Sequence, residues 1–220
     1  MFKYYFSKYF SIIKSIIFFL LSISGIVISF IAFIPRKLVI NPARKYILIG
    51  FAIIYIVRLV VHFFEFENNR KKPDWINTLI YMYFSGLIGY VIVISSIGCE
   101  ITIGLIDYLG IALYLLGSYL NTRAEYEKYQ YRRSQGDESG LFLGGLFRYS
   151  RNIDHFGTFI IYLGWVIPTR NIYAMAIPLN AAIIYIFGII PQKDKRLIKK
   201  YGRIYKEYAR KTKKFIPFIY

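Results

Sequence analysis

The sequence predicts an all-α fold: a polytopic membrane helical bundle of about six transmembrane helices, followed by a C-terminal amphipathic helix at the membrane interface. Three observations predict this fold, namely the apolar composition, the length of the uncharged stretches and the uneven distribution of Lys and Arg. Of the 220 residues, 56% are hydrophobic and 20% are aromatic, which leaves too little polar surface for an ordinary water-facing globule. The 29 Lys and Arg against 12 Asp and Glu give a formal net charge of +17.

Six apolar stretches are expected to cross the membrane, since about 30 Å of hydrocarbon requires roughly 20 helical residues. The five long stretches cover residues 15–34, 46–64, 75–98, 103–120 and 172–190. The sixth, 155–167, is shorter, begins in polar residues and ends at Pro168. We therefore expect it to be a partial span whose start lines a cavity. The first stretch is too long for the core of a signal peptide, so we expect it to be retained.

The basic residues indicate the orientation of these spans. With six spans, both termini and two loops lie on one side, which then carries 23 Lys and Arg against 5 on the other side. Because basic loops stay on the cytoplasmic side, we expect an integral, multi-pass protein with both termini in the cytoplasm or, in an organelle, the matrix. The positive charge is thus explained by topology, and nucleic acid is not an expected partner.

The organisation along the chain is simple. We expect N-terminal transmembrane helices over 1–104 and a second membrane region over 105–220, which together form a single domain. Gly110 and Gly117 are candidates for close helix contacts. The single Cys99 and two histidines exclude an internal disulfide and make a metal site improbable.

The polar residues fall in two stretches on the basic side. Residues 121–133 continue helically from the fourth span, either as a solvated extension or as a basic wall in which Arg132 or Arg133 binds phosphate. The glycine-rich loop 135–145 has no Gly-Lys-Ser/Thr ending and no preceding strand, so it is predicted to form turns rather than to bind a nucleotide.

Residues 146–157 place charged groups at the mouth of a membrane helix. Charges at this depth need partners or water, so the stretch either borders a water-filled cleft or contains an Arg151–Asp154 pair that holds the helix end. Arg58 and His62, four residues apart in the second span, share one face. They either pair with a carboxylate such as Asp107 or Glu100, or line a substrate cavity.

Residues 194–210 have apolar or aromatic side chains on one helical face and Lys and Arg on the other. This pattern is typical of a helix that lies among lipid headgroups, so membrane lipids are expected partners. Residues 211–220 become aromatic again and are expected to pack back against the bundle.

Several short motifs occur in order over about 105–220. They are Asn121-Thr122-x-x-Glu125, Gly145-Leu146-Phe147-x-Tyr149-Ser150-x-Asn152-Ile153-x-x-Phe156-Gly157, Ile190-Pro191-x-x-Asp194, Lys200-Tyr201-Gly202 and Lys211-Thr212-Lys213-Lys214-Phe215-Ile216-Pro217-Phe218-Ile219-Tyr220. In these motifs the chain resembles the C-terminal half of the membrane reductases grouped with steroid 5-alpha-reductases and sterol C14-reductases, especially a branch of unknown function.

This resemblance implies a bundle whose last helices and basic-side loops hold NADPH. A lipophilic substrate then enters from the bilayer, and hydride reduces an activated carbon–carbon double bond. The residues that the resemblance assigns to the cofactor are Asn121, Glu125, Arg133, Arg151, Asn152, Asp154, Asp194, Tyr205 and Tyr208. The expected proton donors are His155 and Tyr149, and Arg58 and His62 are the candidates for the substrate cavity.

Four positions of 151–158 differ from the family pattern, Arg/Met-His-Pro/Ile-Asn-Tyr-x-Gly-Glu/Asp: the chain has Asn152, Asp154, His155 and Thr158 there. These differences favour an alternative function, a non-catalytic lipid-binding protein or an accessory subunit of a larger membrane complex, for example a mitochondrial one. The related isoprenylcysteine and phospholipid methyltransferases share less of the pattern, because Lys193 and Asp194 stand where they have paired glutamates.

Overall fold

The structure, a computed structural model, describes residues 41–61, 99, 101–135 and 140–220. Across these residues the chain is helical without any named strand, and an isolated parallel bridge joins Ser150 and Lys213. The all-α prediction is therefore confirmed for this part of the chain. Two predicted spans, 15–34 and 75–98, lie outside the described residues.

One described helical stretch, Ile172–Lys211, is long and apolar enough to cross a membrane by its length and composition. The structure does not support the prediction of six such spans in the residues that it describes. It also joins two elements that we expected to be separate, since the apolar stretch 172–190 runs on into the amphipathic helix. Pro191 lies at the start of α7, Ile190–Lys211, directly after the π-helical turn Ile184–Ile189. The hydrogen-bond pattern changes there, so the missing N–H of Pro191 does not end the helical stretch.

The chain divides into two compact units, which are described separately. The first comprises 1–104 and 168–174, and its described helix is α2, Pro42–Val61. Leu48, Ala52 and Tyr55 form the buried face of α2. The buried Arg44 donates from Nη1 to the Sγ of Cys99 at 2.8 Å and to the carbonyl oxygen of Ile101 at 2.9 Å.

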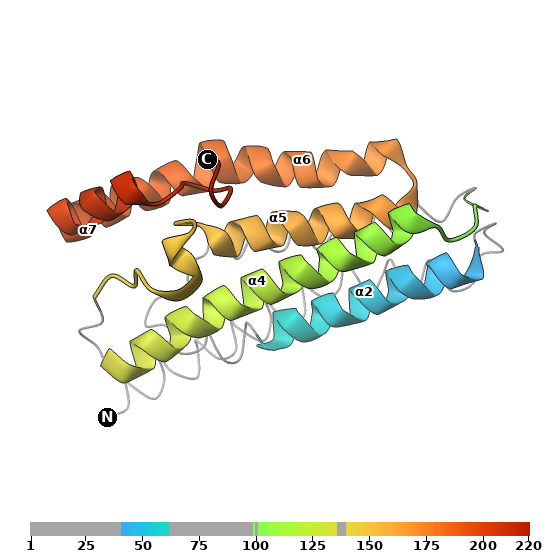
Figure 1. Cartoon of the computed structure of the whole chain (residues 1–220), viewed down its shortest axis with the longest axis horizontal. Helices are drawn as coiled ribbons and strands as arrows, with labels where there is room; N and C mark the ends of the chain where they lie inside the picture. Colours follow the sequence, from blue (N-terminus) through green and yellow to red (C-terminus); the bar gives the residue numbers. More distant parts are fainter. Residues whose placement is uncertain (1–40, 62–98, 100, 136–139) are drawn as a thin grey trace, which may run out of the picture. The chain divides into compact units, whose positions relative to one another are not determined.

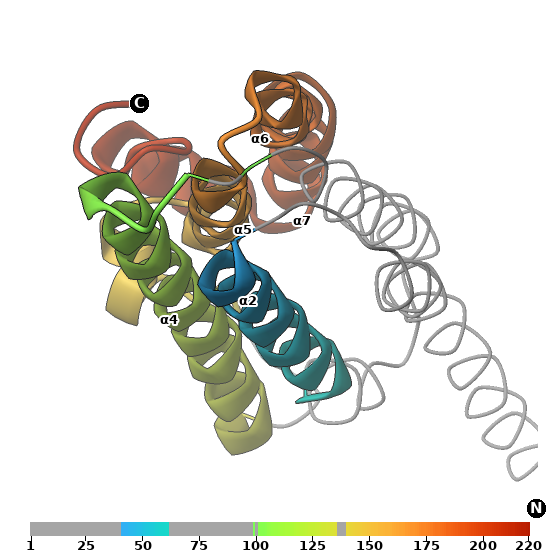
Figure 2. The ribbon, with the colours of Figure 1, turned by 90° about the vertical axis from the view of Figure 1, so that its right-hand side faces the viewer.

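The second unit comprises 105–167 and 175–220. Its helices are α4, Leu105–Gln135; η3, Gly145–Arg148; α5, Ile153–Val166; α6, Ala176–Ile183; η6, Ile184–Ile189; and α7. The short helices η4, Ile167–Thr169, and η5, Ile172–Met175, lie at the changes from one unit to the other. Helix α5 packs against both α4 and α6, as Figures 1 and 2 show.

Helices α4 and α5 pack through glycines, which we call the glycine seam: Gly110, Gly117, Gly157 and Gly164. A Cβ at Gly117 would lie 2.6 Å from the backbone nitrogen of Ile161, and a Cβ at Gly157 would lie 2.7 Å from that of Asn121. The backbones are therefore in direct contact, and no larger residue fits without separating the helices. This confirms Gly117 as a close-contact position.

Helix α7 reverses direction at Gly202. Its φ of 55° and ψ of −120° belong to the region that L side chains avoid, so the helix breaks into two segments here. As a result Tyr205 donates its hydroxyl hydrogen to Asp194, eleven residues earlier, which a straight helix would hold about 16 Å away. Only glycine permits this turn without strain.

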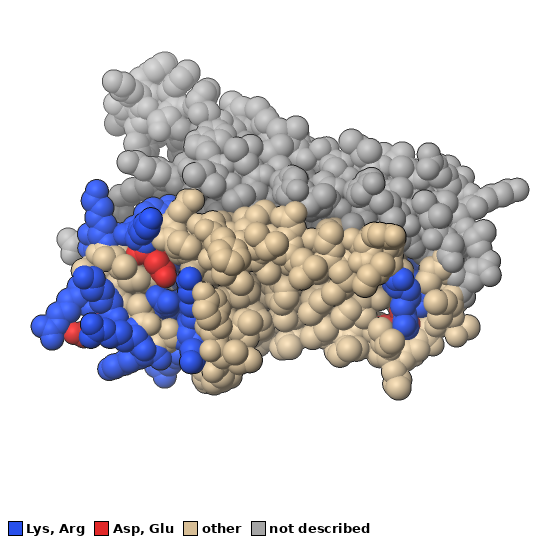
Figure 3. All heavy atoms as spheres, turned by 90° about the horizontal axis from the view of Figure 1, so that it is seen from above, with Lys and Arg blue, Asp and Glu red and all other residues tan. Residues whose placement is uncertain are grey.

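Charge and apolar surface are separated along this part of the chain. Figure 3 shows a large group of Lys and Arg at the end where α7 lies in Figure 1 and a smaller group at the opposite end, whereas α6 and η6 contain no charged residue. Exposed apolar side chains continue along these two helices and include Leu179, Ile183 and Phe187. The boundary between the two surfaces falls at the start of α7, and the candidate site lies beside it.

Candidate functional site

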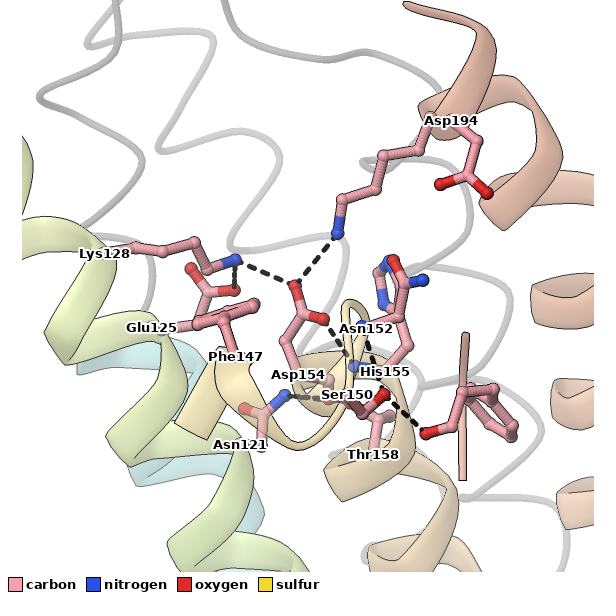
Figure 4. Close-up of polar contacts among 12 residues, drawn as sticks. Asn121, Glu125, Lys128, Phe147, Ser150, Asn152, Asp154, His155, Thr158 and Asp194 are labelled. Atoms are coloured by element: carbon pink, nitrogen blue, oxygen red, sulfur yellow. Dashed lines mark hydrogen bonds and ion pairs between the residues drawn. The ribbon is translucent and has the colours of Figure 1, made fainter. Parts of the chain in front are cut away.

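The polar residues of three helices meet at one end of the second unit. Figure 4 shows Glu125 and Lys128 from α4 beside Asp154 at the start of α5, with Asp194 of α7 above them. We call the six charged residues that meet here the charged junction: Glu125, Lys128, Arg151, Asp154, Lys193 and Asp194. These residues meet because the loop after η3 leads directly into α5, and because the start of α7 lies beside this loop.

Asp154 is the centre of the charged junction. Its Oδ2 atom accepts from the Nζ of Lys128 at 2.8 Å and lies 3.6 Å from the Nζ of Lys193. Lys128 also donates to the Oε1 atom of Glu125 at 2.6 Å. Asp154 lies in the first turn of α5, where the helix dipole favours an anion, and its Oδ1 atom accepts from the backbone N–H of His155.

The charges determine the protonation of this centre. Burial alone would raise the pKa of the Asp154 carboxyl, but the ammonium groups of Lys128 and then Lys193 hold it well below its usual value. Burial likewise opposes the charge on Lys128, yet Asp154 and Glu125 raise the pKa of its ammonium group. Both partners are therefore ionised at neutral pH.

Asn121 connects α4 to α5 at the level of the glycine seam. Its Nδ2 atom donates to the carbonyl oxygen of Asp154 at 2.8 Å and to Oγ1 of Thr158 at 3.0 Å. The hydroxyl of Thr158 in turn donates to the carbonyl oxygen of Asp154 at 3.2 Å. The two bonds from Asn121 thus join α4 to α5 in the buried interior, and the bond from Thr158 lies within α5.

Arg151, three residues before Asp154 in the sequence, forms an ion pair with α7. Its Nη1 atom is 3.4 Å from Oδ2 of Asp194, whose other oxygen accepts from the hydroxyl of Tyr205. The Arg151 guanidinium also lies 6.0 Å from the centroid of the Tyr205 ring. The reversal at Gly202 therefore brings Tyr205 and Asp194 to the same cation.

Two buried atoms at the start of α5 have no hydrogen-bond partner: Nε of Arg151, a donor, and Oδ1 of Asn152, an acceptor. The other amide atom of Asn152, Nδ2, donates to the carbonyl oxygen of Lys214 at 2.7 Å. Leaving a buried polar atom unpaired costs about 1–3 kcal/mol, so such atoms indicate a site for a further polar group.

The other predicted residues occupy different places. Tyr208 donates to the carbonyl oxygen of Phe147 at 2.7 Å, so it holds α7 to η3. Arg133 is exposed in the last turn of α4. Arg58 is half-buried in the last turn of α2, in the first unit, and His62 lies outside the described residues.

The two predicted proton donors differ in burial. The ring of His155 stacks on that of Tyr185, with 4.8 Å between centroids and 15° between planes. Tyr149 is 49% exposed and packs on Phe218 at 5.4 Å.

Lys193 is the residue of the charged junction that the sequence prediction missed, whereas helical spacing predicts the pair of Lys128 with Glu125. Lys193 gave no such signal, because its partner Asp154 lies in another helix. With Arg151 the two lysines supply three positive charges against the three carboxylates of the charged junction, so the six charges cancel.

The arrangement fits an anionic or amide-bearing ligand at one place, the start of α5. There a guanidinium donor and an amide acceptor are buried without protein partners. Elsewhere in the charged junction the ionic partners are protein groups.

A family model described as "Protein of unknown function (DUF1295)" matches residues 8–212. The match covers nearly the whole chain, so the chain belongs to the DUF1295 family. This family lies in the steroid 5-alpha-reductase-like group, which confirms the predicted resemblance at the level of the group. No curated protein matches the chain.

Proposed function

We propose, from the premise that the chain belongs to the DUF1295 family, that it is a multi-pass integral membrane protein that binds NADPH and reduces a carbon–carbon double bond of a lipophilic substrate. One observation carries this proposal: the unpartnered Nε of Arg151 and Oδ1 of Asn152 lie at positions that the resemblance assigns to the cofactor. Support for the membrane location comes from the apolar helical stretch Ile172–Lys211 and from the segregation of basic residues.

In this proposal the chain's own residues bind and orient the cofactor. Arg151 donates to a phosphate or carboxamide oxygen, while Asp194 and Tyr205 hold its guanidinium in place. Asn152 accepts through Oδ1. Bound NADPH would supply the hydride. Of the two expected proton donors, Tyr149 is the better candidate, because burial lowers the pKa of His155 to about 4 and leaves its ring neutral at pH 7.

The test is NADPH binding by the full chain, purified in lipid nanodiscs and titrated by cofactor fluorescence. We expect Arg151→Lys to weaken binding by about tenfold or more, because an ammonium cannot reproduce the guanidinium geometry. The matched control is Arg203→Lys: Arg203 is 91% exposed and pairs only locally, with Glu207 at 2.7 Å. Absence of binding by the parent, or equal binding by all three proteins, would overturn the proposal.

A second candidate function is a non-catalytic accessory subunit of a larger membrane complex. The observation that favours it is that three residues departing from the family pattern all make internal contacts: Asp154 with Lys128, Thr158 with Asn121, and His155 with Tyr185. Stable co-purification with several other subunits, together with no NADPH binding, would favour this candidate. A chain that purifies alone would exclude it.

A further inference from the structure

The C-terminal tail, residues 212–220, folds back onto the start of α5. Three consecutive tail carbonyls accept from three consecutive residues there. Arg151 donates its backbone N–H to Lys213 at 2.9 Å, Asn152 donates Nδ2 to Lys214 at 2.7 Å, and Ser150 donates its hydroxyl to Phe215 at 2.8 Å. The parallel bridge between Ser150 and Lys213 belongs to the same contact.

Phe215 anchors this contact. It is 1% exposed, and its ring packs edge-on against Phe156 of α5 at 5.7 Å between centroids and lies 6.3 Å from Tyr185 of η6. The next turn closes the tail on itself, since Phe215 N–H donates to the carbonyl oxygen of Tyr220. Burial of one aromatic ring thus holds three hydrogen bonds in register.

The tail contacts the two residues whose buried atoms lack partners. The orientation of the Asn152 amide is determined by its bond to Lys214, and this bond leaves Oδ1 directed away from the tail carbonyl. The backbone of Arg151 is held by Lys213. The tail thus fixes the backbone at Arg151 and the side-chain amide of Asn152, whereas Asp194 of α7 holds the Arg151 guanidinium.

We propose that the tail is a positioning element for the ligand site, and that Phe215 is its positioning residue. Phe215 acts through Arg151 and Asn152 and does not itself contact the ligand. The identity of the ligand as NADPH rests on the proposed function, but the ordering of residues 150–152 by the tail does not.

The test compares three variants of the full chain in nanodiscs by amide hydrogen exchange. In Phe215→Ala the amide of Arg151 should exchange at least about tenfold faster, while amides of the glycine seam keep their protection. Phe215→Leu should restore most of the protection. The matched control is Phe218→Ala, because Phe218 is 75% exposed in the same tail, and it should behave as the parent.

NADPH titration of the same proteins gives the second readout. We expect about tenfold weaker binding in Phe215→Ala and parental binding in Phe218→Ala. If Phe215→Ala does not fold, Ser150→Ala removes one of the three bonds at nearly constant volume and should speed Arg151 exchange severalfold.

Unchanged exchange at Arg151, or faster exchange spread evenly over α4 and α5, would overturn the inference. If the parent does not bind NADPH, the proposed function fails, while the exchange pattern still decides the role of the tail.

Discussion

Helices α4 and α5 are joined in two different ways along their length. In the glycine seam the backbones touch, and Gly157 lies against the nitrogen of Asn121. At the charged junction the helices are linked through side chains, with Lys128 bound to Asp154. The seam depends on shape and admits no added atom, whereas the junction depends on a balance of charge that a substitution or a ligand can change.

The largest expected effect is at the centre of the charged junction. Asp154→Asn leaves the ammonium groups of Lys128 and Lys193 with Glu125 as the nearest remaining carboxylate. Removal of one partner from a buried ionic group costs roughly 3–5 kcal/mol, so we expect a loss of about 4 kcal/mol in the free energy of unfolding. Thermal or denaturant unfolding in detergent measures it.

The matched control for this substitution is Glu207→Gln. Glu207 is 53% exposed in its ion pair with Arg203, so we expect a change below about 0.5 kcal/mol. Equal stability of the two variants would contradict a structural role for Asp154.

The glycine seam should be nearly as sensitive. Gly157→Ala places a Cβ 2.7 Å from the backbone nitrogen of Asn121 and must push the helices apart, which we expect to cost about 3 kcal/mol. The control is Gly188→Ala, where no atom lies within 4 Å and where alanine favours a helical backbone. A parental melting temperature in Gly157→Ala would show that the backbones are not in contact.

Acid should weaken the junction and leave the seam unchanged. Because the pKa of Asp154 is lower in the folded than in the unfolded protein, its stabilisation is present above about pH 4 and is lost as pH falls further. The stability difference between the parent and Asp154→Asn should therefore shrink progressively as the pH falls below about 4. The difference between the parent and Gly157→Ala should stay constant over the same range.

The smallest effect concerns the reversal of α7. Tyr205→Phe removes one hydrogen bond to Asp194 and should cost about 1 kcal/mol. Tyr126→Phe is the control, since the Tyr126 hydroxyl bonds to Gln130 on an exposed helical face. If both variants lose equal stability in unfolding measurements, the Tyr205 bond has no special role.

The glycine seam and the charged junction also differ in how far the sequence predicts their contacts. On the α4 side the glycine seam was predictable, because Gly110 and Gly117 recur at helical spacing, whereas Gly157 and Gly164 of α5 were not predicted. Pro168 correctly indicated the end of the helix that begins at Ile153. The pairing of Lys193 with Asp154 was not visible, because a contact between distant helices leaves no local pattern. The bond from Tyr205 to Asp194 was missed because helical periodicity assumes a straight helix, whereas Gly202 reverses it.

The position of bound NADPH tests the central proposal most directly. A map of the purified chain with NADPH at high resolution should place a phosphate or the carboxamide of the cofactor within hydrogen-bond distance of Arg151 Nε, with Asn152 facing it. Density for the cofactor elsewhere, or a start of α5 with no ligand at saturating NADPH and with Arg151 paired only to Asp194, would contradict it.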